Sequence, residues 1–251
     1  MLMPVILQNE LARLVLRSDA PRAGGRPGKL STCQALKCIF YVCRTGCQWN
    51  ELPCPQGVHF KTAYHRFHMW SKMRIFEDCF YNLVTAYRSH QQLPLVADTS
   101  YVKNIRGCDV IGRNHTDRGR YATKVSLLSD SRSIPLTLAF HRGNRNDLKT
   151  LGHLLDTAQR KLGGNLFLHG TLYADKGYDA AVCRNACTRH GLQPRIPRKM
   201  TNESWNSVRC AVEVTFGRLD NFRRILMRHE SGIVSFKAFH FLAASYLVAK
   251  S

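Results

Sequence analysis

The sequence predicts an α/β protein with a mixed β-sheet flanked by helices and a small N-terminal all-α domain. Two observations predict this class. Up to about residue 90 the apolar residues recur at helical spacing, whereas from residue 93 short runs of strand length alternate with helical stretches. The order from residue 93 is strand, hairpin, helix, strand, helix, strand and two helices. That order is typical of a mixed sheet covered by helices, with the first strand beside the fourth.

The N-terminal helices are predicted from amphipathic spacing and from their caps. Residues 1–18 favour a short helix, and the Pro- and Gly-containing residues 19–29 indicate a basic linker. Ser31 or Thr32 is a suitable N-cap for the next helix, and Gly46 is a suitable stop. Two further helices are expected over these segments: 59–72 and 74–88.

The second part of the chain is predicted in the same way. Residues 93–98 form a strand, and residues 130–133 are the turn of a hairpin. Asp147 is expected to cap a helix that Gly163 ends. The remaining predicted elements are the hairpin strands 121–129 and 134–141, strand 170–174, helix 179–190, strand 193–197, one long helix 205–228 and a final helix 235–249.

These elements suggest three parts. Residues 1–28 hold the first helix and the linker, residues 29–90 form a helical domain, and residues 93–251 form the domain that contains the mixed sheet. The helical domain is expected to bind DNA, for example through a helix-turn-helix, although helical spacing is equally compatible with a domain that only packs.

Charge indicates the class of partner. The 251 residues include 37 Lys and Arg against 17 Asp and Glu, a net charge of +20, and the excess of base runs through both parts of the chain. Such a field favours a polyanion, of which nucleic acid is the commonest. The alternative is a basic surface that serves only solubility. At 44% hydrophobic and 10% aromatic, the chain can also bury a core.

Targeting signals are not apparent in the sequence. The apolar opening residues lack a basic n-region, and no apolar run approaches the length of a membrane span. The ten cysteines form no Cys-x-x-Cys pair, which favours reduced thiols over a zinc site. We therefore expect a cytoplasmic, nucleoid-associated protein with no membrane partner.

Three acids point to a reaction. Asp98 and Asp175 each end a short apolar strand, and Glu213 lies on a predicted helix. Adjacent strands lie about 4.8 Å apart, so carboxylates at matching ends can share one ion. Hard oxygen ligands suit Mg²⁺ or Mn²⁺, and such ions catalyse the cleavage of phosphodiesters. A plain salt bridge between Glu213 and Arg209, one turn earlier, is the alternative for that acid.

Basic residues surround these acids in the sequence. Lys176 follows Asp175 directly, Lys103 lies in the polar segment 102–120, and a run of arginines follows Glu213 on the predicted long helix. Gly217 lies one turn after Glu213, where a close neighbour such as a DNA backbone would explain a mid-helix glycine. The residues predicted to contact DNA are Lys103, Lys124, Lys176, Arg209, Arg218, Arg223 and Arg224.

At this point the residues resemble a known family. The segment Arg44-Thr-Gly-Cys-Gln-Trp-Asn-Glu-Leu-Pro53 resembles a signature of DDE transposases of the insertion-sequence-five group, within the insertion-sequence-four/five superfamily. Tyr64-His-Arg-Phe-His-Met-Trp70 resembles the next block of that family. The segments around Asp98, Ala174-Asp-Lys-Gly-Tyr-Asp179 and Arg209-x-x-x-Glu213-x-x-Phe-Gly-Arg resemble its three catalytic blocks.

The resemblance implies a ribonuclease-H-like catalytic fold, with Asp98, Asp175 and Glu213 as the catalytic and metal-binding triad. It implies magnesium or manganese as cofactor, binding to the terminal inverted repeats of an insertion sequence, and cut-and-paste transposition into target DNA. Synapsis of two DNA ends implies a homodimer or a larger assembly. Two other functions fit the same residues: an inactive DNA-binding derivative of such a transposase, and a metal-dependent nuclease that does not join strands.

Overall fold

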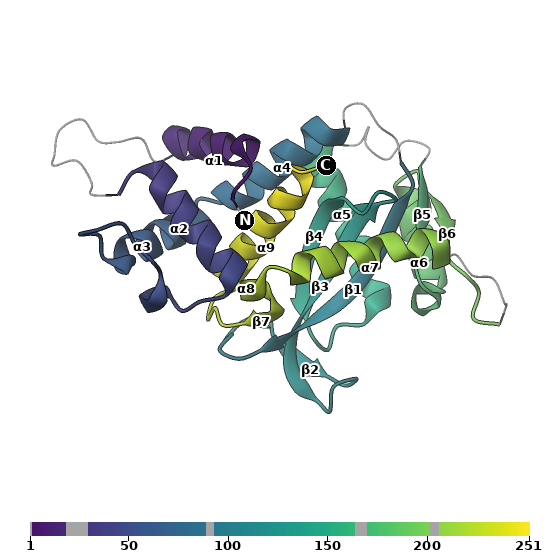
Figure 1. Ribbon diagram of the computed structural model, residues 1–251. Coiled ribbons are helices and arrows are strands. Elements are labelled where there is room, and N and C mark those ends of the chain that lie inside the picture. The colour runs from purple at the N-terminus through teal and green to yellow at the C-terminus, as the bar shows by residue number, and fades with distance from the viewer. Residues whose placement is uncertain (1, 19–29, 89–92, 164–169, 201–205) are drawn as a thin grey trace.

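The computed structural model describes residues 2–18, 30–88, 93–163, 170–200 and 206–251. Helices of the N-terminal part lie at one side of the molecule, and the sheet with its own helices lies at the other (Figure 1). The predicted linker 19–29 is outside the described residues. The N-terminal helices are α1 (Val5–Ser18), α2 (Thr32–Thr45), α3 (Phe60–Lys72) and α4 (Ile75–Arg88), with a 3₁₀ turn η1 (Trp49–Glu51).

Helix α2 begins and ends at the predicted residues. The Ser31 side chain accepts a hydrogen bond from the backbone N–H of Gln34, and the Gln34 side chain accepts one from the backbone N–H of Ser31, which completes a capping box. Gly46 adopts a left-handed conformation with φ of 71° and returns its N–H to the carbonyl of Val42. A Cβ at Gly46 would also lie 3.0 Å from the Cβ of Arg223, so two requirements select glycine there.

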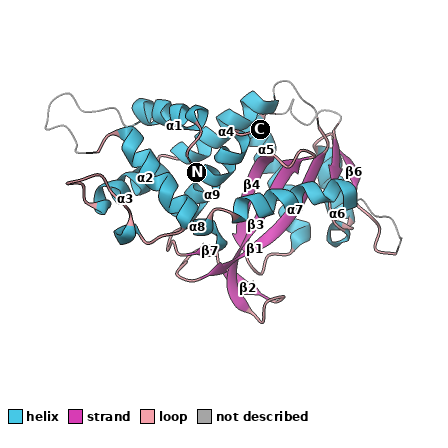
Figure 2. Cartoon of the chain, viewed as in Figure 1, coloured by secondary structure: helices cyan, strands magenta, loops and turns pink. Residues whose placement is uncertain are grey.

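The sheet has the order β2-β3-β1-β5-β6, and β4 also pairs with β3, while β7 pairs with β1 (Figure 2). Strand β1 is antiparallel to β3 and parallel to β5, the fourth predicted strand, and β5 is parallel to β6. This mixed, ribonuclease-H-like arrangement confirms the predicted fold class. The strands are β1 (Leu95–Asn104), β2 (Gly112–Asn114), β3 (Arg120–Asp130), β4 (Pro135–Arg142), β5 (Thr171–Tyr173), β6 (Gln193–Arg195) and β7 (Met227–Arg228).

Helices cover both faces of the sheet. Asp98 of β1 lies opposite Leu127 of β3, which in turn lies opposite Leu138 of β4, so the three side chains share one face of the sheet. Helix α7 packs on this face, against β1 and β3. Helix α5 packs on the other face, where His153 stacks edge to face on His141. The remaining elements are α5 (Asp147–Leu162), the 3₁₀ turn η3 (Lys176–Tyr178), α6 (Ala181–Arg189), α7 (Asn206–Asp220), α8 (Arg223–Leu226) and α9 (Ile233–Val248).

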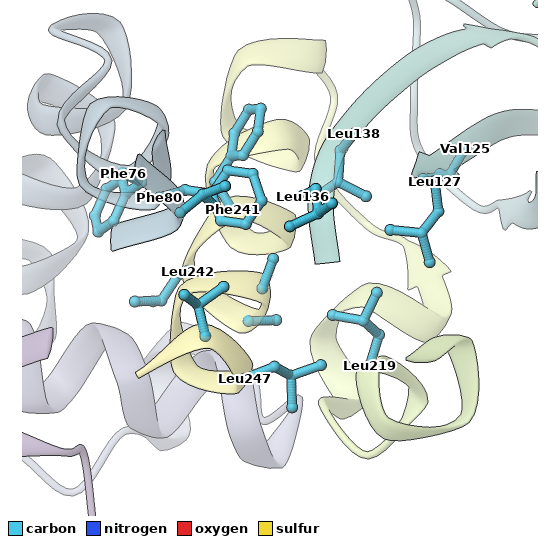
Figure 3. Packing of buried hydrophobic residues seen from close by; sticks show 14 of the residues in the cluster. Phe76, Phe80, Val125, Leu127, Leu136, Leu138, Leu219, Phe241, Leu242 and Leu247 are labelled. Carbon is cyan, nitrogen blue, oxygen red and sulfur yellow. The ribbon is translucent and has the colours of Figure 1, made fainter. Parts of the chain in front are cut away.

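Helix α9 joins the two sides of the molecule. It is apolar all round and packs against α2, α3, α4 and β4. Figure 3 shows Phe241 of α9 between Phe80 of α4 and Leu136 of β4. The buried hydrophobic residues of the N-terminal helices and of the sheet therefore belong to one cluster. Whether residues 29–90 form a domain of their own stays a prediction. None of the helices in the described ranges combines the length and apolarity needed to cross a bilayer.

The predicted long helix 205–228 is wrong, because the chain turns after α7. Phe222 is buried, with its ring 6.1 Å from that of Phe40 and 5.3 Å from that of Tyr246. Its N–H donates to the carbonyl of Leu219, and the Asn221 side chain donates to the carbonyl of Gly217. Burial of this one ring ends the helix, and the chain continues through α8 into strand β7.

Two smaller predictions are also corrected. The N-cap of α5 is Asn146, whose side chain accepts a hydrogen bond from the N–H of Leu148, so Asp147 is the first helical residue and its carboxylate is free for another role. The polar segment 102–120 is partly regular, because β1 continues to Asn104 and residues 112–114 form β2. Pairing with β3 explains both extensions.

Candidate active site

Asp98 and Asp175 meet because of strand register. In the parallel pair of β1 and β5, Val96 lies opposite Tyr173, and each acid follows two residues later. The two carboxylates therefore leave the sheet at the same level, as the sequence predicted. Each carboxylate accepts a hydrogen bond from the next backbone N–H, at 2.7 Å for Thr99 and 2.6 Å for Lys176. Asp175 also serves as the N-cap of η3.

Glu213 reaches the same place from helix α7, through Arg209. The Arg209 guanidinium lies 3.3 Å from Asp175 Oδ1 through Nη1, and 3.8 Å from Glu213 Oε1 through Nη2. The predicted pair of Arg209 and Glu213, one turn apart, is present. The same arginine also bridges to the strand acid, so one guanidinium brings Glu213 and Asp175 to a common point.

The charges of the other two acids influence Asp98. Burial raises the pKa of the Asp98 carboxyl, and the negative charges of Asp175 and Glu213 raise it further. The Thr99 N–H and the charge of Arg209 oppose this rise. Asp98 is half-buried, whereas the side chains of Asp175 and Glu213 are 48% and 64% exposed. The cluster therefore has one buried acid at its base and two acids open to a ligand.

The donor set suits a hard divalent cation, because all three candidate ligands are carboxylates. Within the described residues, no three His, Cys, Asp or Glu side chains stand close enough together to hold one ion. At this site the guanidinium of Arg209 lies between two of the acids. A metal ion would have to replace this cation between Asp175 and Glu213.

Five of the predicted DNA-contacting residues lie where a ligand can reach them. Lys103, Lys176 and Arg223 are exposed, and Arg209 and Arg218 are half-buried. Arg218 donates a hydrogen bond to the carbonyl of Ser133 at 3.0 Å, so part of its side chain is held by the protein. Lys176 follows Asp175 directly, and Arg209 contacts it, so both cations border the acids.

Lys124 and Arg224 have internal roles instead. Lys124 is 1% exposed, and its ammonium donates at 2.6 Å both to the carbonyl of Arg145 and to Asp147 Oδ1. Arg224 pairs with the buried Glu230 at 2.7 Å and donates to the carbonyl of Cys47. Because both side chains have partners inside the fold, we do not expect either of them to contact DNA. Lys124 is buried because it lies in the paired strand β3. Arg224 points to Glu230 because the chain turns after α7, where a continuous helix was predicted.

A polar network behind Asp98 was not predicted. Thr99 donates to Asp147 Oδ1 at 3.1 Å, the same oxygen that receives the Lys124 ammonium. Tyr178, three residues after Asp175, is buried, and its hydroxyl lies in the environment of Thr99. The network thus ties β1, η3 and the start of α5 together next to two of the acids. The sequence signal for it was Lys124, a charged residue in the middle of the predicted strand 121–129.

Comparison with sequence families gives two adjoining matches. Residues 9–80 match the family described as "Putative transposase of IS4/5 family", and residues 81–248 match the family described as "Transposase DDE domain". A curated relative from Burkholderia cepacia, the "Putative transposase for insertion sequence element IS402", is 34% identical over 124 residues. The match covers 47% of this chain and 59% of that protein, so it spans less than two thirds of the relative.

Similar solved structures include a viral intasome and a transposase. The simian T-cell lymphotropic virus intasome in complex with PP2A regulatory subunit B56 gamma has a TM-score of 0.34 and 15% identity, covering 52% of this chain and 40% of that chain. The catalytic domain of Mos1 mariner transposase has a TM-score of 0.33 and 10% identity, covering 66% and 88%. At such low scores, the sequence matches alone carry the family assignment. The match to the transposase DDE domain family spans more than half of this chain's residues. The chain therefore belongs to that family, in the IS4/5 group.

Proposed function

We propose that this protein is a transposase that cuts DNA at the terminal inverted repeats of its own element and joins the freed ends to target DNA. Asp98, Asp175 and Glu213 would form its active site. The observation that supports this proposal is the set of interactions among these acids: one guanidinium contacts Asp175 and Glu213, and the charges of both acids raise the pKa of Asp98. Three carboxylates that repel one another favour a functional reason for their placement.

A divalent cation is the reason that we propose for the cluster. Magnesium or manganese, bound by Asp98, Asp175 and Glu213, would activate the attacking oxygen and stabilise the leaving oxygen at the phosphorus. The protein supplies the ligands from three elements that the core holds rigidly. Thr99 and Lys176 orient Asp98 and Asp175 through their backbone N–H groups. Arg209 neutralises two of the acids, and once a divalent cation took its place its guanidinium would be free to bind a DNA phosphate.

The reaction would proceed in two balanced displacements. In the first, a water oxygen attacks the phosphorus at the end of the element, the bond to the 3′-oxygen breaks, and a 3′-hydroxyl and a 5′-phosphate result. In the second, that 3′-hydroxyl attacks a phosphorus of the target, forms a new phosphodiester and releases the target's own 3′-hydroxyl.

DNA would approach along the surface of α7. Arg209, Arg218 and Glu213 lie on this helix, and Lys176 and Arg223 flank it with exposed side chains. Apart from its chain neighbours and the backbone of α7, no atom of the described residues lies within 4 Å of the place that a Cβ of Gly217 would take, so a phosphate backbone could come close one turn beyond Glu213. Exposed Lys103 would extend the interface along β1. The protein would act in the cytoplasm at the nucleoid, as a homodimer or larger assembly that holds two ends.

A cleavage and joining assay tests the proposal. Purified full-length protein is incubated with DNA that carries the inverted repeats flanking its coding sequence, with magnesium or manganese and with a target plasmid. We expect end cleavage and strand joining by the wild type, and loss of both in Glu213→Gln with retention of DNA binding in a gel-shift assay. Asp78→Asn, which removes the charge of an exposed acid on α4, is the control and should keep full activity.

Each other outcome has a defined meaning. If the wild type binds the ends but neither cuts nor joins them, the protein is an inactive DNA-binding derivative. Cleavage without joining would identify a nuclease. If Glu213→Gln cleaves as well as the wild type, the assignment of the site is wrong.

A further inference from the structure

A second candidate site lies away from the three acids. Helices α3, α4, α5 and α9 and strand β4 enclose a cavity of about 450 Å³. None of these elements carries Asp98, Asp175 or Glu213. Small-molecule sites in proteins have volumes of roughly 300–1,000 Å³, so the cavity has the size of a ligand site.

The floor of the cavity is apolar. Phe76, Leu138 and Phe241 line it and are buried, and Figure 3 shows them where α4, β4 and α9 meet. Phe140 adds a further ring to the lining. These side chains give the cavity a rigid floor that can accept the flat or aliphatic body of a ligand.

The rim is cationic, and one carboxylate is shared among its charges. Arg74, Arg160, Lys161 and Lys237 line the cavity together with a single acid, Glu77. Glu77 pairs with Arg74 at 3.0 Å and with Lys161 at 2.8 Å. The Glu77 carboxylate is therefore already paired with two of the four cations, Arg74 and Lys161.

Arg160 and Lys237 form no ion pair within the described part of the chain. Arg160 makes one hydrogen bond, to the Thr157 hydroxyl at 3.5 Å, and no ion pair. The half-buried Lys237 ammonium lies over the Phe140 ring, 5.5 Å from its centroid, and contacts no carboxylate. His153 also lines the cavity, and its pKa is lowered by burial and by nearby cations, so it remains neutral and can donate a hydrogen bond.

We propose that this cavity binds a nucleoside monophosphate, with the phosphate held by Arg160 and Lys237 and the nucleoside on the apolar floor. Two cations that form no ion pair match the nearly double negative charge of a phosphate monoester, and a guanidinium can bind phosphate with two hydrogen bonds. Such a group exists both on a free mononucleotide and on the 5′-phosphorylated end of a DNA strand. The proposal does not depend on the catalytic role of the three acids.

Calorimetric titration of the full-length protein with AMP tests this site. We expect AMP to bind at physiological salt and adenosine to bind much more weakly. Arg160→Gln and Lys237→Gln should each weaken AMP binding by about tenfold, the loss of one charged hydrogen bond. Lys149→Gln is the matched control, because Lys149 is an exposed cation on the same helix as Arg160 but does not line the cavity.

Competition identifies the source of the phosphate. If a 5′-phosphorylated oligonucleotide displaces AMP and its 5′-hydroxyl counterpart does not, the site holds a DNA end. If neither displaces AMP, it holds a free nucleotide. The proposal is overturned if AMP does not bind, if adenosine binds as tightly, or if Lys149→Gln weakens binding as much as Arg160→Gln. Melting temperatures verify that the variants fold. If Lys237→Gln does not fold, the AMP affinity of Arg160→Gln, a change at an exposed position, decides the outcome.

Discussion

At the scale of single residues, Asp98 shows how a site can oppose stability. Its carboxyl is half-buried and faces two other negative charges, and its pKa is raised. In the folded state the carboxyl therefore holds its proton to a higher pH than in the unfolded state. The native state loses free energy of unfolding as pH rises from the ordinary Asp pKa, about 4, to the raised pKa.

Asp98→Asn should therefore make the protein more stable at neutral pH while removing its proposed catalytic function. The amide oxygen can still accept the Thr99 N–H, whereas the penalty of a buried charge is gone. Urea unfolding at a series of pH values measures the effect, and the gain should shrink towards zero below about pH 4. Asp117→Asn, whose side chain is 47% exposed, is the control and should change little. A variant no more stable than the wild type at pH 7 would contradict this account.

Lys124 shows the opposite case, a charge that supports the fold. Its buried ammonium holds Asp147 and the carbonyl of Arg145. Lys124→Met should lower the free energy of unfolding by about 2 kcal/mol, the value of a charged hydrogen bond in a protected place. Urea denaturation measures it, and Lys149→Met, exposed on α5, should stay within about 0.5 kcal/mol of wild type. Equal losses in both variants would show that the network contributes nothing.

At the scale of elements, the segment after α7 is held by Arg228. This side chain is 0% exposed in β7, forms an ion pair with Asp109, and donates to the Thr123 hydroxyl at 2.9 Å and to the carbonyl of Ser231 at 3.1 Å. The guanidinium thus fastens β7 to the segment between β1 and β2. Together with buried Phe222, it explains why a sequence of helical character forms a turn and a strand.

Arg228→Met should cost about 3 kcal/mol or more, because it leaves the buried Glu230 carbonyl, the buried Thr123 hydroxyl and the Asp109 carboxylate without this donor. The midpoint of urea unfolding measures this loss. Arg223→Met, a change of the same kind at an exposed position of α8, is the control. The role assigned to Arg228 fails if both variants unfold at the same urea concentration.

At the scale of the whole molecule, α9 makes the helical part and the sheet depend on each other. The Phe239 ring stacks on Phe67 of α3 at 4.3 Å, and Phe241 of the same helix lies 6.1 Å from Phe140 of β4. One helix thus lies between both sides of the core. Unfolding of either side would expose its apolar surface, so the two should unfold together.

Calorimetry of the full chain should therefore show a single cooperative transition. Phe239→Ala should lower the free energy of unfolding by about 4 kcal/mol and move the whole transition to lower temperature. Val234→Ala, an exposed position on α9, should have a small effect. Two resolved transitions, or a Phe239→Ala variant that loses only part of its helical signal, would show that the parts are independent.

The sequence alone determined most of the local structure. The caps of α2, the helical spacing of α1 to α5 and the alternation of strands and helices after residue 93 each depend on neighbouring residues, and the structure has these elements where they were predicted. The sequence also selected Asp98, Asp175 and Glu213, because two of these acids follow short apolar runs and the third lies one turn from an arginine in a chain with few acids. The structure corrects one detail, since Asp98 lies inside β1 and not at its end. Their catalytic roles stay predictions.

Only the tertiary structure decided what depends on distant contacts. Phe222 ended α7 because it enters a pocket between Phe40 and Tyr246, far away in sequence. Lys124 and Arg224 resembled DNA-binding cations, but strand pairing and the turn after α7 gave them internal partners. The physical reason is the range of the forces: caps and periodicity act within a few residues, whereas burial and charge pairing depend on which segments the core brings together.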